Sequence, residues 1–387
     1  MIQLKTPYVP EALGYDSSRL DVLNRFFQEQ IDGKELYGAA YAIAREGKMF
    51  AVGALGKQSY REEDERPLRL DAIFRTYSIT KLFTAVSIFQ LIEDGLCRLD
   101  DPMMSFISEM EKDFPKTTIA QALSHTGGLP VEGELYPSRE IVDPWTLIDR
   151  EFNRGGRDWV SAGLKSGPAS APGTRWEYSN FGYVLLGLLI ERLTGVRAEQ
   201  YIEEKIIVPC GMTDSGFWNT VKKLPDFAGR LFIHNEHFEK ALADPNKAPG
   251  PWAAVPQTFN GIYSTAPDLV KFGNMLLNGG RLDGRRILGR KAIEKMTAVY
   301  VKPDIRSYCW NENGLYRAHG LGPDVGYDDM YFHTPGAYNH EGWGRSRLMM
   351  DPREKLTTAY FIPLLDVDTW KPTPVWNPEI IICSGLM

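Results

Sequence analysis

Ser78 and Lys81 are the residues of this 387-residue sequence whose types and spacing most directly suggest chemistry. Residues three apart on a helix lie about one turn apart, so the Ser78 hydroxyl and the Lys81 amine would face the same way. A serine is a poor nucleophile at neutral pH until a base removes its proton, and a desolvated lysine can be that base. The S-x-x-K pattern also arises by chance, so the pair by itself is only a hypothesis.

A second candidate pair, Tyr178 and Asn180, precedes an apolar run over residues 184–190. The run predicts a helix, with Ser179 or Asn180 as its N-terminal cap and Gly195 at its end. Tyr178 would then lie in the turn before the helix, where its phenol can project into a cleft. The alternative interpretation is a packing tyrosine beside a plain helix cap.

A third segment, His340-Glu341-Gly342-Trp343, precedes a strand-like stretch over residues 346–350. A glycine beside a strand lets a substrate lie close against the strand edge. Three segments that are distant in sequence thus offer a nucleophile, proton-transfer groups and a binding edge.

Together these segments resemble the signature of the serine β-lactamase and penicillin-binding-protein superfamily. The similarity is to the branch of class C β-lactamases, family VIII carboxylesterases, D-aminopeptidases and DD-carboxypeptidases. Ser78 and Lys81 match its S-x-x-K motif, and Tyr178 and Asn180 match its Y-x-N motif. The third motif, K-T-G in β-lactamases, reads H-E-G at residues 340–342 here. The resemblance covers roughly residues 20 to 365.

The resemblance implies a reaction in which Ser78 attacks an acyl carbonyl and forms an acyl-enzyme that water then hydrolyses. Lys81 and Tyr178 would share the proton transfers, and which of them is the principal base stays open. The backbone N–H groups of Ser78 and Trp343 would form the oxyanion hole. Asn180 would hold Lys81 or the substrate amide in place.

The substituted third motif changes the expected substrate. A lysine there supplies a permanent cation for a carboxylate, whereas His340 is mostly neutral at pH 7. Glu341 would repel a carboxylate if it points inward, but neighbours on a strand alternate faces, so it can equally point outward. We therefore count His340, Glu341, Gly342 and Trp343, with Asn180, as substrate-binding candidates for neutral or amine-bearing esters and amides.

The function expected from these residues is a serine esterase or amidase on small acyl substrates. A β-lactamase or DD-carboxypeptidase is the alternative within the same chemistry. A non-catalytic acyl-binding sensor with the same fold is a further alternative, although such a protein would be free to lose Ser78, Lys81 or Tyr178.

No cofactor or metal ion is expected. His234 and His237 are close in sequence but lack the H-E-x-x-H spacing of a zinc site and an obvious third ligand. The sequence also contains no G-x-S-x-G motif, which argues against an α/β-hydrolase.

The composition, 43% hydrophobic and 24% charged residues, is that of an ordinary globular protein. The resemblance implies a small-molecule ester, amide or β-lactam substrate. The net charge of −6 argues against nucleic acid and anionic membranes as partners. No signal peptide or membrane span is visible, and the four cysteines lie far apart, so we expect reduced thiols and a cytoplasmic location. The oligomeric state is not determined by the sequence.

The pattern of elements predicts an α+β fold. A helix is expected at 17–31, strands at 38–44 and 49–53, a helical and loop-rich middle, and strands again at 346–350 and 356–362. This order suits an antiparallel sheet built from both chain termini, flanked by helices, with an inserted mostly helical domain. We expect residues 1–75 and 271–387 to form the sheet domain, residues 76–270 the helical domain, and the active site to lie between them. The resemblance implies the β-lactamase/transpeptidase-like fold.

Overall fold

The computed structural model describes residues 2–3, 6–136, 139–244, 250–307, 309, 314–326, 332–363 and 373–387. Its largest sheet has seven strands in the order β1-β3-β2-β15-β14-β13-β12, and every neighbouring pair is antiparallel. Its strands are β1 (Ile2–Gln3), β2 (Gly38–Arg45), β3 (Lys48–Gly56), β12 (Asp324–Val325), β13 (Tyr338–Gly342), β14 (Ser346–Asp351) and β15 (Leu356–Phe361). The prediction of an α+β fold with an antiparallel sheet drawn from both ends of the sequence is confirmed.

The hairpin of β2 and β3 shows how local sequence sets this sheet. Glu46 and Gly47, which join the two strands, have φ values of 55° and 75°. Positive φ at both central residues is what a tight two-residue hairpin turn requires. Along β2, Ala40 and Ala42 enter one apolar core and Tyr41 enters the other. The strand is therefore apolar on both faces, because both faces of the sheet are covered.

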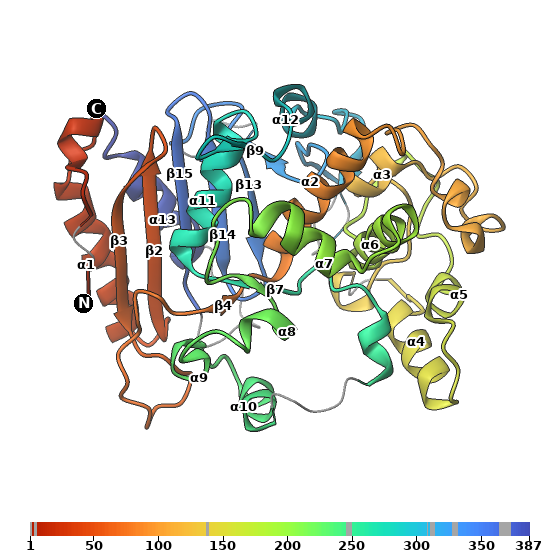
Figure 1. The fold of residues 1–387 in the computed structure, drawn as a ribbon, viewed down its shortest axis with the longest axis horizontal. Coiled ribbons are helices and arrows are strands. Elements are labelled where there is room, and N and C mark those ends of the chain that lie inside the picture. The colour runs from red at the N-terminus through yellow and green to blue at the C-terminus, as the bar shows by residue number, and fades with distance from the viewer. Residues whose placement is uncertain are drawn as a thin grey trace.

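Helices cover the two faces of the sheet (Figure 1). On one face α1 (Ser18–Asp32) lies against α13 (Thr373–Cys383), and on the other α11 (Ala266–Leu277) crosses β2, β14 and β15. The sheet is therefore the middle layer of three.

The segment between β3 and α11 is mostly helical. Its helices α2 (Thr80–Glu93) and α6 (Asn180–Thr194) contact each other and are buried along most of their length, as helices apolar on nearly all sides must be. The remaining α-helices are α3 (Ile119–Leu123), α4 (Pro144–Asn153), α5 (Trp159–Leu164), α7 (Ala198–Ile202), α8 (Trp218–Val221), α9 (Phe227–Arg230), α10 (Glu236–Ala243) and, beyond α11, α12 (Arg290–Thr297). The short strands are β4 (Phe74–Arg75), β5 (Arg175–Trp176), β6 (Gly216–Phe217), β7 (Ile262–Ser264), β8 (Arg281–Leu282), β9 (Arg285–Arg286), β10 (Arg306–Ser307) and β11 (Leu315–Tyr316).

A small antiparallel sheet, ordered β4-β7-β6, leads into the Ser78 segment. Arg75 in β4 is registered against Tyr263 in β7. Directly after β4, the backbone N–H and the hydroxyl of Thr76 both donate to the Ile262 carbonyl, at 2.9 and 3.0 Å. These bonds fix the backbone just before Ser78.

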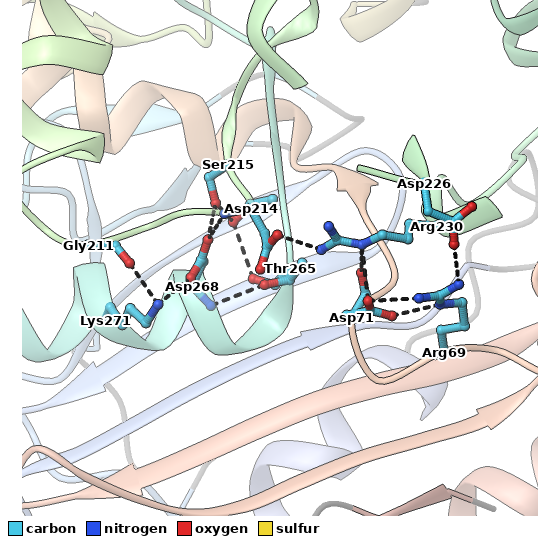
Figure 2. A network of polar contacts seen from close by, with 11 residues as sticks. Arg69, Asp71, Gly211, Asp214, Ser215, Asp226, Arg230, Thr265, Asp268 and Lys271 are labelled. Carbon is cyan, nitrogen blue, oxygen red and sulfur yellow. Dashed lines mark hydrogen bonds and ion pairs between the residues drawn. The ribbon is translucent and has the colours of Figure 1, made fainter. Parts of the chain in front are cut away.

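Figure 2 shows a polar network that anchors the loops around this small sheet. The buried Asp268 carboxylate of α11 accepts hydrogen bonds from the Asp214 backbone N–H at 2.8 Å and the Ser215 hydroxyl at 2.9 Å. The Arg230 guanidinium, only 8% exposed, forms ion pairs with Asp71 at 3.1 Å and Asp214 at 2.7 Å. Because buried charges need such partners, the network ties α11 to the loops that precede β6 and β4.

Two further expectations from the sequence concern membrane-spanning helices and the cysteines. A membrane-crossing helix needs about 20 apolar residues, and no described helix of this chain combines such length with such hydrophobicity. The cysteines at 97, 210, 309 and 383 are buried free thiols. The division of the chain into a sheet domain of residues 1–75 and 271–387 and a helical domain of residues 76–270 stays a prediction.

Candidate active site

Ser78 lies in the short helical turn Tyr77–Ile79 that begins α2. The residue before it, Tyr77, has a φ of 49°, a left-handed conformation that costs a non-glycine residue about 1–3 kcal/mol. Tyr77 is held by the His234 ring, 5.9 Å between centroids, and by the Arg75 guanidinium, 5.1 Å from its ring centroid. Such strain clusters at functional sites, and here it accompanies a Ser78 that is only partly buried.

Lys81 is completely buried one turn further along α2. Its Nζ lies 3.0 Å from Ser78 Oγ, 2.7 Å from Asn180 Oδ1 and 3.1 Å from the Phe259 carbonyl oxygen. Burial lowers the pKa of Lys81 well below its usual range, and the nearby Glu132 carboxylate opposes that shift. A lysine with such a lowered pKa can carry a free amine, which is the form that accepts a proton.

Tyr178 lies between β5 and α6, in the turn predicted from the sequence. The Ser179 hydroxyl caps α6 by accepting a hydrogen bond from the Gly182 N–H at 2.9 Å. Tyr178 is 7% exposed, and its ring centroid lies 4.7 Å from Lys81 Nζ. Burial raises the pKa of Tyr178 far above its usual range, although its hydrogen bond with Ser78 lowers it. Tyr178 therefore keeps its proton at neutral pH and can donate it.

Gly342, the last residue of β13, lies against the turn that carries Ser78. A Cβ at Gly342 would overlap the Thr76 carbonyl oxygen and the Ser346 hydroxyl, so this close approach requires glycine. The Ser346 hydroxyl donates to the same Thr76 oxygen at 2.9 Å. Trp343 follows with 52% exposure. The third candidate segment therefore meets the nucleophile segment directly.

His340 is 4% exposed. Its Nδ1 lies 2.8 Å from the Glu341 carbonyl oxygen, so Nδ1 carries the proton and Nε2 is left as an acceptor. Among the described residues Nε2 has no hydrogen-bond partner. Burial, followed by the nearby Lys81 charge, lowers the pKa of His340 to about 3. His340 is therefore neutral at neutral pH.

Residues 23–365 of the chain match the family described as Beta-lactamase. The chain belongs to the Beta-lactamase family. Esterase EstB of Burkholderia gladioli is 31% identical over 219 residues, 54% of each chain. Penicillin-binding protein 4 of Amycolatopsis lactamdurans is 28% identical over 226 residues, 56% of this chain and 54% of that one. The chain thus spans about half the length of these two curated relatives in each match.

Solved structures resemble this member of the Beta-lactamase family over nearly its full length. A structure described as a family VIII carboxylesterase is 23% identical, with a TM-score of 0.71, and the match covers 96% of this chain and 98% of that one. The fold implied by the sequence resemblance is therefore confirmed.

Glu341 lies on the opposite face of β13 from His340. In the register of β13 with β14, Glu341 stands opposite Arg347 and His340 opposite Leu348. The Arg347 guanidinium forms ion pairs with Glu341 at 2.8 Å and with Glu379 of α13 at 2.6 Å. Of the two orientations left open by the sequence, the outward one is found, and Glu341 is directed away from Ser78.

Glu132 is not among the residues that the sequence indicates, yet it lies against the first turn of α6, behind Asn180. Its buried carboxylate accepts hydrogen bonds from the backbone N–H groups of Asn180 at 3.3 Å and Phe181 at 3.0 Å. Burial raises the pKa of Glu132 to about 7, while these hydrogen bonds and Lys81 oppose the shift. Glu132 thus holds the first turn of α6 and places a titratable charge near Lys81.

His234, weighed as a metal ligand, is instead surrounded by aromatic rings. Phe232 and Tyr77 lie 4.8 and 5.9 Å from it between centroids. Within the described ranges, no group of three or more histidine, cysteine, aspartate or glutamate side chains is arranged to hold a metal ion.

Proposed function

We propose that this protein is a serine hydrolase that cleaves small esters or amides through an acyl-enzyme on Ser78. The observation that carries the proposal is a buried amine with a lowered pKa, 3.0 Å from a partly exposed serine hydroxyl. An unprotonated lysine at this distance can act as the general base that a serine nucleophile needs.

In the proposed acylation step, Lys81 takes the Ser78 proton as Oγ attacks the carbonyl carbon. The backbone N–H groups of Ser78 and Trp343 stabilise the oxyanion. Tyr178, which keeps its proton, donates it as the bond to the leaving group breaks. Protonated Lys81 then returns a proton to the Tyr178 phenolate, which restores both groups. In deacylation a water molecule attacks the acyl carbon, and the proton transfers run in reverse until Ser78 regains its proton.

Asn180 acts by positioning Lys81. Its Oδ1 accepts a hydrogen bond from Nζ at 2.7 Å, and Glu132 holds the backbone of the same residue. The amine is thus aimed at Ser78 by two side chains that need not touch the substrate.

The substrate preference follows from His340. A neutral imidazole with a free acceptor nitrogen cannot anchor a carboxylate at the β13 side of the site, as a lysine would. We therefore favour neutral or donor-bearing groups there, and place His340, Gly342 and Trp343 in contact with the substrate. Glu341 is left out of these contacts because of its ion pair with Arg347.

A β-lactamase or DD-carboxypeptidase activity is the second candidate, supported by the similarity to Penicillin-binding protein 4. A sensor role without catalysis has weaker support, because a binding protein has no need of a base beside Ser78.

Rates with p-nitrophenyl butyrate and with nitrocefin, measured on the same preparation, test the proposal. We expect a higher kcat/KM for the ester, and a Ser78→Ala variant that hydrolyses neither compound. Faster nitrocefin hydrolysis would reverse the preference between the two candidates. No hydrolysis of either compound, with no acylation of the protein, would favour the sensor.

A further inference from the structure

A cavity of about 250 Å³ adjoins the proposed reacting centre. Its lining includes Arg75, Trp145, Trp252, Gln257, Phe259 and Asn260. Phe259 connects the cavity to the reacting centre. It lines the cavity, and its carbonyl accepts a hydrogen bond from Lys81 at 3.1 Å. Arg75 lies in β4, three residues before Ser78. The cavity therefore adjoins the segment that leads into Ser78 and the residue that accepts a hydrogen bond from Lys81.

The cavity walls are aromatic. Trp145 stacks on Phe259 with 5.4 Å between centroids and 21° between planes, and Trp252 lies 6.2 Å from Trp145. Pockets for drug-sized ligands have volumes of about 300–1,000 Å³, so this smaller cavity suits one ring with a short chain. Trp252 is 36% exposed, which leaves part of the aromatic wall open to an incoming group.

Arg75 brings an uncompensated positive charge to this aromatic cavity. Its Nε and Nη2 donate to the carbonyl and side-chain oxygens of Asn260 at 3.0 and 2.9 Å. Nη1 makes no hydrogen bond, and Arg75 has no ion pair with any carboxylate in the described ranges. The titratable groups that its charge reaches are Tyr77, Tyr263 and His234, and burial keeps all three neutral near pH 7 by raising the tyrosine pKa values and lowering that of His234 to about 3.

We propose that this cavity binds a flat apolar group that carries a carboxylate, as in an aromatic acid, on one side of the substrate. The ring would pack against the Trp145 and Trp252 side chains that line the cavity, and the carboxylate would accept hydrogen bonds from Nη1 and the second N–H of Nη2 of Arg75. The assignment to a substrate rests on the proposed function, whereas binding of the aryl carboxylate does not. Recognition of negative charge would thus lie at Arg75, away from the neutral His340.

Calorimetric titration with 3-phenylpropionate and its neutral amide, 3-phenylpropionamide, tests this site. We expect the acid to bind on the order of tenfold more tightly than the amide, as a hydrogen bond to a charged group allows. Arg75→Gln keeps an amide donor for Asn260 but removes the charge, and it should abolish the preference. Arg281→Gln, which changes the same charge at an exposed position on β8, should keep it. Melting temperatures show whether each variant is folded.

A second variant tests the aromatic wall separately. Trp145→Leu should weaken binding of the acid and the amide by similar factors, because stacking does not distinguish them by charge. Equal affinities for the two compounds in the unaltered protein, or a preference for the acid that survives Arg75→Gln, would overturn the proposal. So would unchanged binding of both compounds in a folded Trp145→Leu variant.

A competition experiment tests whether the cavity is part of the site at which the ester is hydrolysed. 3-Phenylpropionate should inhibit p-nitrophenyl butyrate hydrolysis competitively, and inhibition that is not competitive would place the site elsewhere. If the protein hydrolyses no ester, the proposed function fails, but the calorimetric comparison still decides whether Arg75 binds the carboxylate.

Discussion

Two walls of the candidate site differ in how their polar groups are bonded. The helical wall consists of Ser78, Lys81 and Asn180, at the starts of α2 and α6. Here Lys81 Nζ forms hydrogen bonds with Asn180 Oδ1 at 2.7 Å and Ser78 Oγ at 3.0 Å. The strand wall consists of His340 and Gly342 of β13 and the following Trp343. Here His340 has a buried Nε2 without a hydrogen-bond partner in the described chain, and Trp343 is 52% exposed.

The helical wall, which keeps the S-x-x-K and Y-x-N motifs, has its polar side chains hydrogen-bonded to one another. The strand wall, where H-E-G replaces K-T-G, has a ring nitrogen without a hydrogen-bond partner in the described chain and an exposed tryptophan. We infer that the helical wall carries the reaction and that the strand wall carries selectivity. Substitutions on the two walls should therefore differ in kind as well as in size.

The largest effect is expected at Ser78. Ser78→Ala should lower ester hydrolysis by about 10⁴-fold or more, since the proposed covalent intermediate cannot form. The melting temperature should stay close to that of the unaltered protein, because the side chain is small and partly exposed. Near-normal hydrolysis of p-nitrophenyl butyrate would show that the nucleophile lies elsewhere.

Lys81→Met should cost about 10²–10⁴-fold in kcat/KM through loss of the general base. In the unaltered protein, kcat/KM should rise with pH as Lys81 loses its proton, because the free amine is the active form. Since burial lowers the pKa of Lys81, this rise should be complete well below the ordinary lysine pKa of about 10.4. A rise centred near that ordinary value would contradict Lys81 as the base.

Tyr178→Phe should be less severe, on the order of 10²-fold, because Lys81 still accepts the serine proton. The loss should depend on the leaving group. A p-nitrophenolate leaves without a proton, whereas an alkoxide or amine needs one, so alkyl esters and amides should lose more rate than p-nitrophenyl esters. Equal losses across such a series would remove Tyr178 from the donor role.

On the strand wall, His340→Lys should raise acylation by penicillins, by about tenfold, through a fixed cation in a partly desolvated site. Ester hydrolysis should stay similar or fall. Glu341→Gln is the matched control, because Glu341 faces Arg347 on the other side of β13. It should lower the free energy of unfolding by about 1–3 kcal/mol, since Arg347 loses one hydrogen-bonded carboxylate but keeps Glu379. The ratio of penicillin to ester reactivity should not change. A changed ratio in Glu341→Gln, or unchanged acylation in a folded His340→Lys variant, would break the division between the walls.

The smallest effect is expected at Glu132, which lies behind the helical wall. Glu132→Gln keeps an oxygen acceptor for one of the two backbone N–H groups, of Asn180 and Phe181, that the carboxylate binds. It also removes a negative charge that favours protonated Lys81. The pKa of Lys81 should fall further, so the acidic limb of the pH profile should move to lower pH, with a rate change of less than about tenfold. A shift to higher pH would contradict this assignment.

The sequence predicted which residues meet, because two motifs fixed the identities of Ser78, Lys81, Tyr178 and Asn180 and helix spacing fixed their local geometry. It could not predict the direction of Glu341, which depends on the register of β13 against β14.

Glu132 and the Phe259 carbonyl escaped prediction for other reasons. A glutamate in a loop carries no local sign that it will lie under the first turn of α6, and a backbone carbonyl has no side-chain signature. Strands β2, β14 and β15 followed from apolar runs, whereas β4, β6 and β7 are only two or three residues long, too short for a periodic pattern. The composition of residues 311–339, rich in glycine, tyrosine, histidine and aspartate, predicts an irregular surface at one side of the cleft. Residues 311–313 and 327–331 of this segment lie outside the described residues.

Intact-mass spectrometry after treatment with a fluorophosphonate tests the central claim most directly. We expect one adduct on the unaltered protein, mapped to Ser78, much slower labelling of Lys81→Met, and no adduct on Ser78→Ala. An adduct of the same stoichiometry on folded Ser78→Ala, or no labelling of the unaltered protein, would contradict a nucleophilic Ser78 activated by Lys81.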